Sequence, residues 1–155
     1  MELFPPPHVL WFEPLEERQT KQIWMDYCRA HPDLEPHEID AADVYSVDEF
    51  SQQFETWVTT KSSKRIRVLM VWHSHFLSLA CQQVLRRWME IKSYRSRVWF
   101  HVELLNAVQQ AIVSRCLVRR VTPSDHVIPV VRVYGDRTDF KDVWLKRMKE
   151  CLKNQ

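Results

Sequence analysis

The sequence predicts an α/β fold, in which a parallel five-stranded sheet is covered by helices on both faces. Two observations support this prediction. Short apolar runs alternate along the chain with segments whose apolar residues recur at helical spacing. The chain has 155 residues, of which 45% are hydrophobic, enough for one domain with a packed core. Strands that alternate with helices pair in parallel, because each crossover helix returns the chain to the same edge of the sheet.

The elements follow in order along the chain. Five apolar runs are expected to form strands: Val9–Phe12, Glu38–Ala41, Arg67–Trp72, Arg97–Val102 and Leu117–Val121. Between them lie four expected helices: Thr20–Ala30, a helix that starts at Ser46, Ser78–Lys92, and Ala107–Ser114 with Asn106 as its N-cap. The second helix begins with the capping-box spacing of Ser46 and Glu49 and continues with an apolar stripe.

The pattern changes after Pro123. The segment VIPVVRVYG reads as a strand, and Pro129 within it places that strand at an edge of the sheet. The segment that follows has apolar residues at helical spacing and many basic residues, with Asp139 as its expected cap. We therefore predict a core domain at 1–122 and a C-terminal extension at 123–155, which contains this edge strand and an amphipathic basic helix.

Composition excludes several classes of protein. The single glycine, Gly135, argues against a glycine-dependent nucleotide site. The four cysteines form no CxxC pair, which argues against a disulfide framework or a zinc knuckle. No apolar run reaches the length of a membrane span, and the first residues lack the pattern of a signal peptide. These features predict an intracellular protein without a membrane partner.

Charge divides the chain into two unlike halves. Residues 1–60 contain 3 Lys/Arg and 13 Asp/Glu, whereas residues 61–155 contain 19 and 7. The basic half is consistent with a nucleic-acid surface, with complementarity between the halves, or with a partner subunit. The candidate nucleic-acid contacts form one local cluster: Arg86, Arg87, Lys92, Arg95 and Arg97.

Two stretches, LSLACQQVLRRWME and SRVWFHVELLNAVQQAIVSRC, resemble the AAA+ module of clamp-loader small subunits, the replication factor C and bacterial delta-prime group. That family carries a helix ending in A-L-R-R-x-M-E, then a strand, then a short helix ending in S-R-C. Leu85–Glu90 matches the first element, and the triplet Ser114, Arg115 and Cys116 matches the second. The resemblance extends from Pro7 to Val121, and it implies a three-layer P-loop NTPase-like core. The lid and collar domains of the family are expected to be missing.

The resemblance also indicates that the residues that bind and hydrolyse ATP in the family have been replaced in this chain. Only Pro14 and Thr20 survive in the loop that matches Walker A: Glu13, Pro14, Leu15, Glu16, Glu17, Arg18, Gln19 and Thr20. Gln19 replaces the lysine that neutralises phosphate. Trp72 and His73 stand where the family has its Walker B carboxylates, and Glu103 replaces the sensor asparagine. We therefore predict no ATP binding or hydrolysis, no cofactor and no small-molecule substrate.

A metal site is not predicted from these residues. His73 and His75 beside Glu103 are of ligand type, but three residues from strand ends do not by themselves make a site.

The preferred functional hypothesis is a catalytically inactive AAA+-like subunit with a structural role in a larger assembly, whose partners include AAA+ proteins or other subunits. One alternative, implied by the resemblance, is a delta-prime-like role in which Arg115 acts as an arginine finger on a neighbour's ATP. Another is nucleic-acid binding through the basic half. A clamp-loader relative would be nuclear, and a mitochondrial location is also compatible with the sequence.

Overall fold

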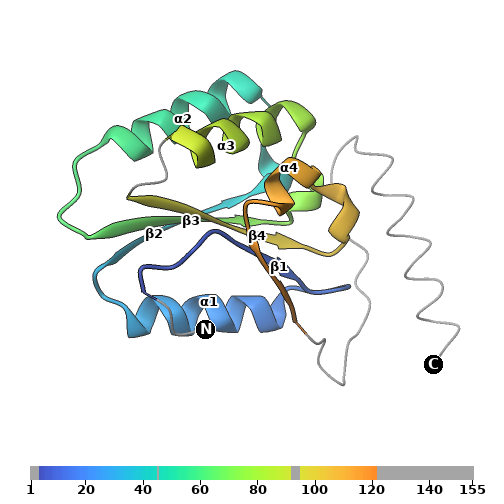
Figure 1. The fold of residues 1–155 in the computed structure, drawn as a ribbon, viewed down its shortest axis with the longest axis horizontal. Coiled ribbons are helices and arrows are strands. Elements are labelled where there is room, and N and C mark those ends of the chain that lie inside the picture. The colour runs from blue at the N-terminus through green and yellow to red at the C-terminus, as the bar shows by residue number, and fades with distance from the viewer. Residues whose placement is uncertain (1–3, 45, 92–94, 122–155) are drawn as a thin grey trace, which may run out of the picture.

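The computed structural model describes residues 4–44, 46–91 and 95–121. It contains one parallel sheet with the strand order β2-β3-β4-β1-β5 (Figure 1). The strands are β1 (Val9–Phe12), β2 (Leu34–Asp40), β3 (Ile66–Trp72), β4 (Ser96–Val102) and β5 (Leu117–Arg120). The helices are α1 (Arg18–Ala30), α2 (Val47–Thr59), α3 (Leu79–Ile91) and α4 (Gln110–Val113). The predicted α/β class and the five parallel strands are confirmed.

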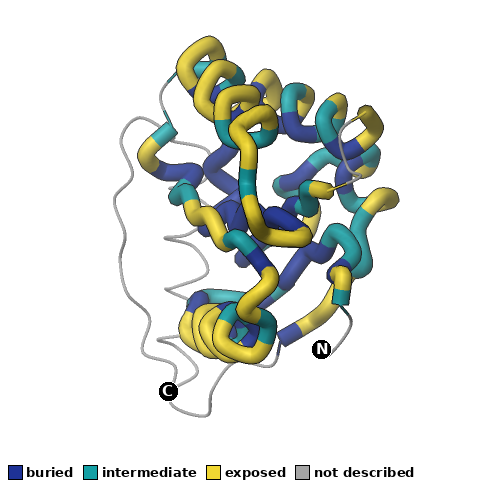
Figure 2. Tube along the Cα trace, turned by 90° about the vertical axis from the view of Figure 1, so that its left-hand side faces the viewer, coloured by how far each residue is buried: buried dark blue, intermediate teal, exposed yellow. Residues whose placement is uncertain are grey.

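Helices cover both faces of the sheet. Helix α1 lies on one face, and α2, α3 and α4 lie on the other (Figure 1). On the α1 face, Trp24 and Tyr27 pack against Trp99 of β4. On the opposite face, residues such as Phe54 and Leu85 form the second cluster. Strand β3 is buried at all seven positions, which explains why it is apolar except at Arg67. The tube in Figure 2 shows this buried interior and the exposed outer side of the helices.

The capping signal of the second helix is confirmed. Ser46 is the N-cap of α2, and its hydroxyl accepts a hydrogen bond from the Glu49 N–H at 3.3 Å. The predicted β2 covered only the second half of the observed strand. The first half was not predicted because it lacks an apolar pattern. β2 is an edge strand that pairs only with β3, so exposed polar residues and Pro36 are tolerated there. Ala41 is in a 3₁₀ turn (Ala41–Asp43), where the Asp40 carboxylate accepts from the Ala42 N–H at 3.0 Å.

The prediction of a single helix over Ala107–Ser114 was wrong. The chain instead forms a 3₁₀ turn (Leu105–Ala107) and then the four-residue α4, whose N-cap is Gln109 rather than Asn106. The side chain of Gln82 on α3 separates the two pieces. Its amide donates to the Ala107 carbonyl at 3.3 Å and accepts from the Gln109 N–H at 2.8 Å. These bonds hold the link between the turn and α4 in an extended conformation.

The predicted edge strand and basic helix of 123–155, and the predicted helical residue Lys92, lie outside the described residues. Within the described ranges, no helix is both long enough and apolar enough to cross a bilayer.

Candidate functional site

The predicted site residues lie together at the carboxyl edge of the sheet. In a parallel sheet, all strands end at the same edge, and ligands of open α/β folds bind there. The loop that follows β1 carries Glu13 and Glu17, His73 follows β3, and Glu103 follows β4. β4 lies between β1 and β3, so the three strand ends are neighbours. Side-chain ligand atoms of Glu17, His73 and Glu103 lie within 4.8 Å of one another.

Glu13 caps the beginning of α1 with its carboxylate. The side chain is fully buried, and its Oε1 accepts from the Thr20 N–H at 2.8 Å and from the Thr20 hydroxyl at 2.7 Å. Its Oε2 accepts from the Gln19 N–H at 3.1 Å. The first N–H groups of a helix have no partner within the helix, and they favour an anion. The chain therefore places its own carboxylate where the resemblance puts a phosphate group.

Two opposing effects set the pKa of Glu13. Burial raises the pKa, and the hydrogen bonds from Thr20 and Gln19 lower it, so that the pKa remains above its ordinary value. These hydrogen bonds therefore offset part of the cost of burying the carboxylate.

The loop between β1 and α1 contains a left-handed residue. Leu15 has a φ of 69°, a conformation that glycine adopts at little cost and that other residues adopt rarely. Its side chain packs, partly buried, against the cluster beneath α2 and α3. The loop therefore has a turn of the kind that glycine favours, but with a side chain that fills space.

His73 is held between two carboxylates. Its backbone is left-handed, with a φ of 54°. The ring Nδ1 lies 3.0 Å from Asp40 Oδ1, and Nε2 lies 3.7 Å from Glu17 Oε2. Burial opposes the charge on the ring, but the hydrogen bonds to Asp40 and Glu17 outweigh it and raise the pKa of His73 to about 9.

Two further histidines are fully buried in the site, and their tautomers follow from their partners. Nδ1 of His75 accepts from the Glu103 N–H at 3.4 Å, and Nδ1 of His101 accepts from the His73 N–H at 3.4 Å. In each ring the proton is therefore on Nε2. From there His101 donates to the Glu16 carbonyl at 3.0 Å, and His75 faces Glu103 Oε2 at 3.4 Å.

The sequence did not indicate Asp40 or His101 as members of this site. Both lie on strands that end at the same edge, which is the signal that could have identified them. Trp72, at the first of the two lost Walker B positions, lies beside His101, with ring centroids 5.6 Å apart. It packs in the cluster beneath α1, and its indole N–H donates to Glu38 Oε1 at 2.7 Å.

The S-R-C triplet makes its contacts within the chain. Arg115 forms an ion pair with Glu90 of α3, and both side chains are partly exposed. The Ser114 hydroxyl donates to the Ala111 carbonyl at 3.1 Å. Cys116 packs against the core, and burial raises the pKa of its thiol to about 12. The action of Arg115 on a neighbour's ATP stays a prediction.

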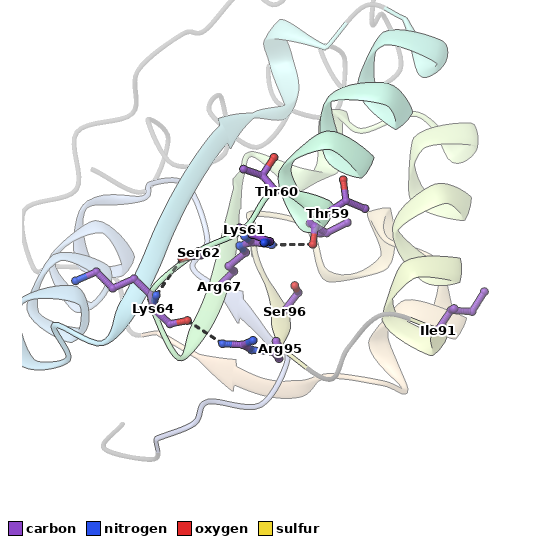
Figure 3. Close-up of a pocket in the computed structure, with 10 residues that line it drawn as sticks. Thr59, Thr60, Lys61, Ser62, Lys64, Arg67, Ile91, Arg95 and Ser96 are labelled. Atoms are coloured by element: carbon purple, nitrogen blue, oxygen red, sulfur yellow. Dashed lines mark hydrogen bonds between the residues drawn. The ribbon is translucent and has the colours of Figure 1, made fainter.

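Members of the predicted basic cluster make different contacts in the structure. Arg86 pairs with Glu90 on its own helix, and Arg97 is partly buried and donates to the Pro6 carbonyl at 3.0 Å. Arg95 lies instead at the amino edge of the sheet, beside a hollow of about 450 Å³ (Figure 3). Three more cations line the same hollow: Lys61, Lys64 and Arg67. Lys92 is outside the described residues.

Comparison with solved structures finds similar folds at low sequence identity. The chain is similar to Thermotoga maritima RuvB, a Holliday junction branch migration motor, with a TM-score of 0.55 and 13% identity over 76% of this chain. It is also similar to a DNA polymerase III gamma subunit-related protein from Thermotoga maritima, with a TM-score of 0.59 and 6% identity over 77% of this chain. It spans 37% and 42% of those chains. No protein-family model and no curated protein matches the sequence.

Proposed function

We propose that this chain is a catalytically inactive AAA+-like subunit with a structural role in a larger assembly. The carboxylate of Glu13 is the observation that carries the proposal. It is bound by the N–H groups of Gln19 and Thr20 and by the Thr20 hydroxyl, which are the groups that would hold a phosphate in a working loop. A nucleotide would have to displace this buried side chain, and the loop offers no lysine in exchange.

Electrostatics supports the same proposal. Three buried carboxylates, Glu13, Glu17 and Glu103, lie around the expected phosphate position. A triphosphate would meet like charges in a setting where water screens them poorly. His73 stands in place of a Walker B carboxylate, and its imidazole does not supply the oxygen ligands that Mg²⁺ prefers.

The structural neighbours support membership in an assembly. One is described as a motor on Holliday junctions and the other as related to a polymerase subunit. A delta-prime-like role for Arg115 is less favoured, because Glu90 of the same chain already pairs with this arginine.

An ATPase assay tests the lack of catalysis. The purified chain is expected to hydrolyse no ATP above the Mg²⁺-containing blank. Thr20→Ala is the matched control, since Thr20 is the surviving residue of the loop. Hydrolysis that persists unchanged in Thr20→Ala comes from a contaminant and agrees with the proposal. Hydrolysis that disappears in Thr20→Ala contradicts it.

Nucleic-acid binding is a second candidate function, and the hollow at the amino edge favours it. Its lining includes four cations, of which Lys61, Lys64 and Arg95 are exposed to solvent. Lys64 and Arg95 also donate to backbone carbonyls, of Pro32 at 2.8 Å and of Lys64 at 3.2 Å, and keep further donors for phosphate groups. Arg67 is less suited, because it is buried and its Nε donates to Glu35 at 2.8 Å. This hollow lies at the other edge of the sheet from the buried carboxylates.

Fluorescence anisotropy with a labelled DNA oligonucleotide tests this candidate. Replacing Lys64 and Arg95 with alanine is expected to weaken binding about tenfold or more and to reduce its salt dependence, because each phosphate contact releases counterions. Arg86→Ala is the control, since Arg86 already pairs with Glu90. Equal weakening by both variants, or no binding by the unmodified chain at low salt, would exclude the hollow as the binding surface.

A further inference from the structure

We propose that Glu17, His73 and Glu103 form a buried binding site for a divalent transition-metal ion such as Zn²⁺. The three residues come from separate parts of the chain: the N-cap of α1, the residue after β3 and the residue after β4. Their exposed fractions are 9%, 4% and 1%. The inference goes beyond the proposed function, because an inactive subunit does not require a metal ion.

The spacing of the donor atoms fits an ion. One ligand atom from each residue lies within 4.8 Å of the other two. With that spacing, an ion can be placed no more than about 2.8 Å from each of the three ligand atoms. Zinc bonds to nitrogen and carboxylate oxygen are about 2.0–2.2 Å long. Side-chain movements of less than about 1 Å would therefore complete the coordination.

The surrounding hydrogen bonds are those of a metal site. A histidine that binds a metal through one ring nitrogen usually donates the other N–H to a carboxylate, which fixes the orientation of the ring. His73 meets this requirement, because Nδ1 faces Asp40 at 3.0 Å while Nε2 faces Glu17. Glu103 also has an imidazole beside it, because Nε2 of His75 lies 3.4 Å from its Oε2. These contacts are an observation independent of the donor spacing.

The left-handed backbone at His73 is also consistent with a functional constraint. Such a conformation is uncommon for a residue other than glycine and is often kept at binding sites. Here it turns the chain directly after β3, so that the imidazole lies between Asp40 and Glu17.

Charge and burial indicate the kind of ion. Three carboxylates, Glu13, Glu17 and Glu103, are buried in segments that follow neighbouring strands of the sheet, and this concentration of negative charge favours a divalent cation. Imidazole favours Zn²⁺, Co²⁺ or Fe²⁺ over Mg²⁺ and Ca²⁺, which prefer oxygen ligands alone. The ion would link α1 to the ends of β3 and β4, and three protein ligands would leave the fourth position of a tetrahedral ion to a water molecule.

Titration of the chelator-treated full chain with Co²⁺ tests the proposal. Co²⁺ is the probe because its visible absorption reports coordination and because thiolate ligands add a separate ultraviolet band. We expect one equivalent of Co²⁺ to bind with visible absorption and without the thiolate band. Zn²⁺ should displace the Co²⁺ and raise the melting temperature.

Variants assign the site. His73→Asn and Glu103→Gln are expected to weaken Co²⁺ binding by about 100-fold or more, since each removes a ligand. Asparagine is chosen at position 73 because it tolerates a left-handed backbone. His37→Ala is the control, because His37 is an exposed histidine on β2. Glu17→Gln gives the same test at the helix N-cap, should either of the first two variants fail to fold.

Three results would overturn the proposal. The first is the absence of Co²⁺ binding by the unmodified chain at Co²⁺ concentrations up to about 1 mM. This limit corresponds to a binding free energy smaller in magnitude than about 4 kcal/mol. The second is unchanged affinity in folded ligand variants relative to His37→Ala. The third is a thiolate band, which would assign the bound ion to cysteine.

Discussion

Replacement of Glu13 by alanine is expected to lower the free energy of unfolding by about 2–4 kcal/mol, because the first turn of α1 loses its cap. Three hydrogen bonds to a fully buried carboxylate disappear together, from the Thr20 N–H, the Thr20 hydroxyl and the Gln19 N–H. Water cannot readily replace the carboxylate at this depth. Urea denaturation, monitored by far-UV circular dichroism, measures the loss. The slope of the free energy of unfolding against urea concentration should be the same in both proteins.

Glu13→Gln is the matched control for this prediction. Its amide oxygen still accepts a hydrogen bond at nearly the same place, but its NH₂ group cannot accept the second N–H. We therefore expect a smaller loss of stability than in Glu13→Ala. Unfolding free energies that are equal for Glu13→Ala and the unmodified chain would contradict the capping role of this carboxylate.

Elements of the fold could be predicted from the sequence where burial or a local capping signal alone determines the residue pattern. Strand β3 is buried on both faces and is therefore continuously apolar from Val68 to Trp72, and α2 begins at a local capping signal, so both were identified. Local sequence could not predict the break before α4. That break depends on Gln82, which reaches residues 25 and 27 positions away. The first half of β2 was missed because an edge strand lacks the apolar pattern of a central one.

The site could be predicted only in part, for a similar reason. Sequence alignment with the family located the loop Glu13–Thr20, His73 and Glu103, and the structure brings them together at one edge. The sequence indicated only that the loop has lost residues that bind phosphate. That Glu13 accepts hydrogen bonds from α1 could not be predicted, because the contact spans seven residues and depends on how the loop turns at Leu15. Asp40 and His101 were missed because they are ordinary polar residues within their strands.

ATP and ADP are expected not to bind the purified chain, with or without Mg²⁺. In a working loop, the backbone N–H groups and a lysine hold the phosphates. Here Glu13 accepts from the N–H groups of Gln19 and Thr20, and the neighbouring Glu17 and Glu103 are buried carboxylates. Binding a nucleotide would break the three hydrogen bonds of the Glu13 carboxylate, and the loop has no lysine to compensate for their loss. The expected dissociation constant is weaker than about 1 mM, a binding free energy smaller in magnitude than about 4 kcal/mol.

Isothermal titration calorimetry of ATP into the folded chain tests the central claim most directly, namely that the chain's own carboxylate fills the nucleotide site. The account predicts only heats of dilution, and no shift of the melting temperature by ATP in a parallel thermal denaturation. Saturable binding of ATP in the micromolar range that is lost in Thr20→Ala would contradict it, because that result would place the nucleotide in the loop that Glu13 occupies.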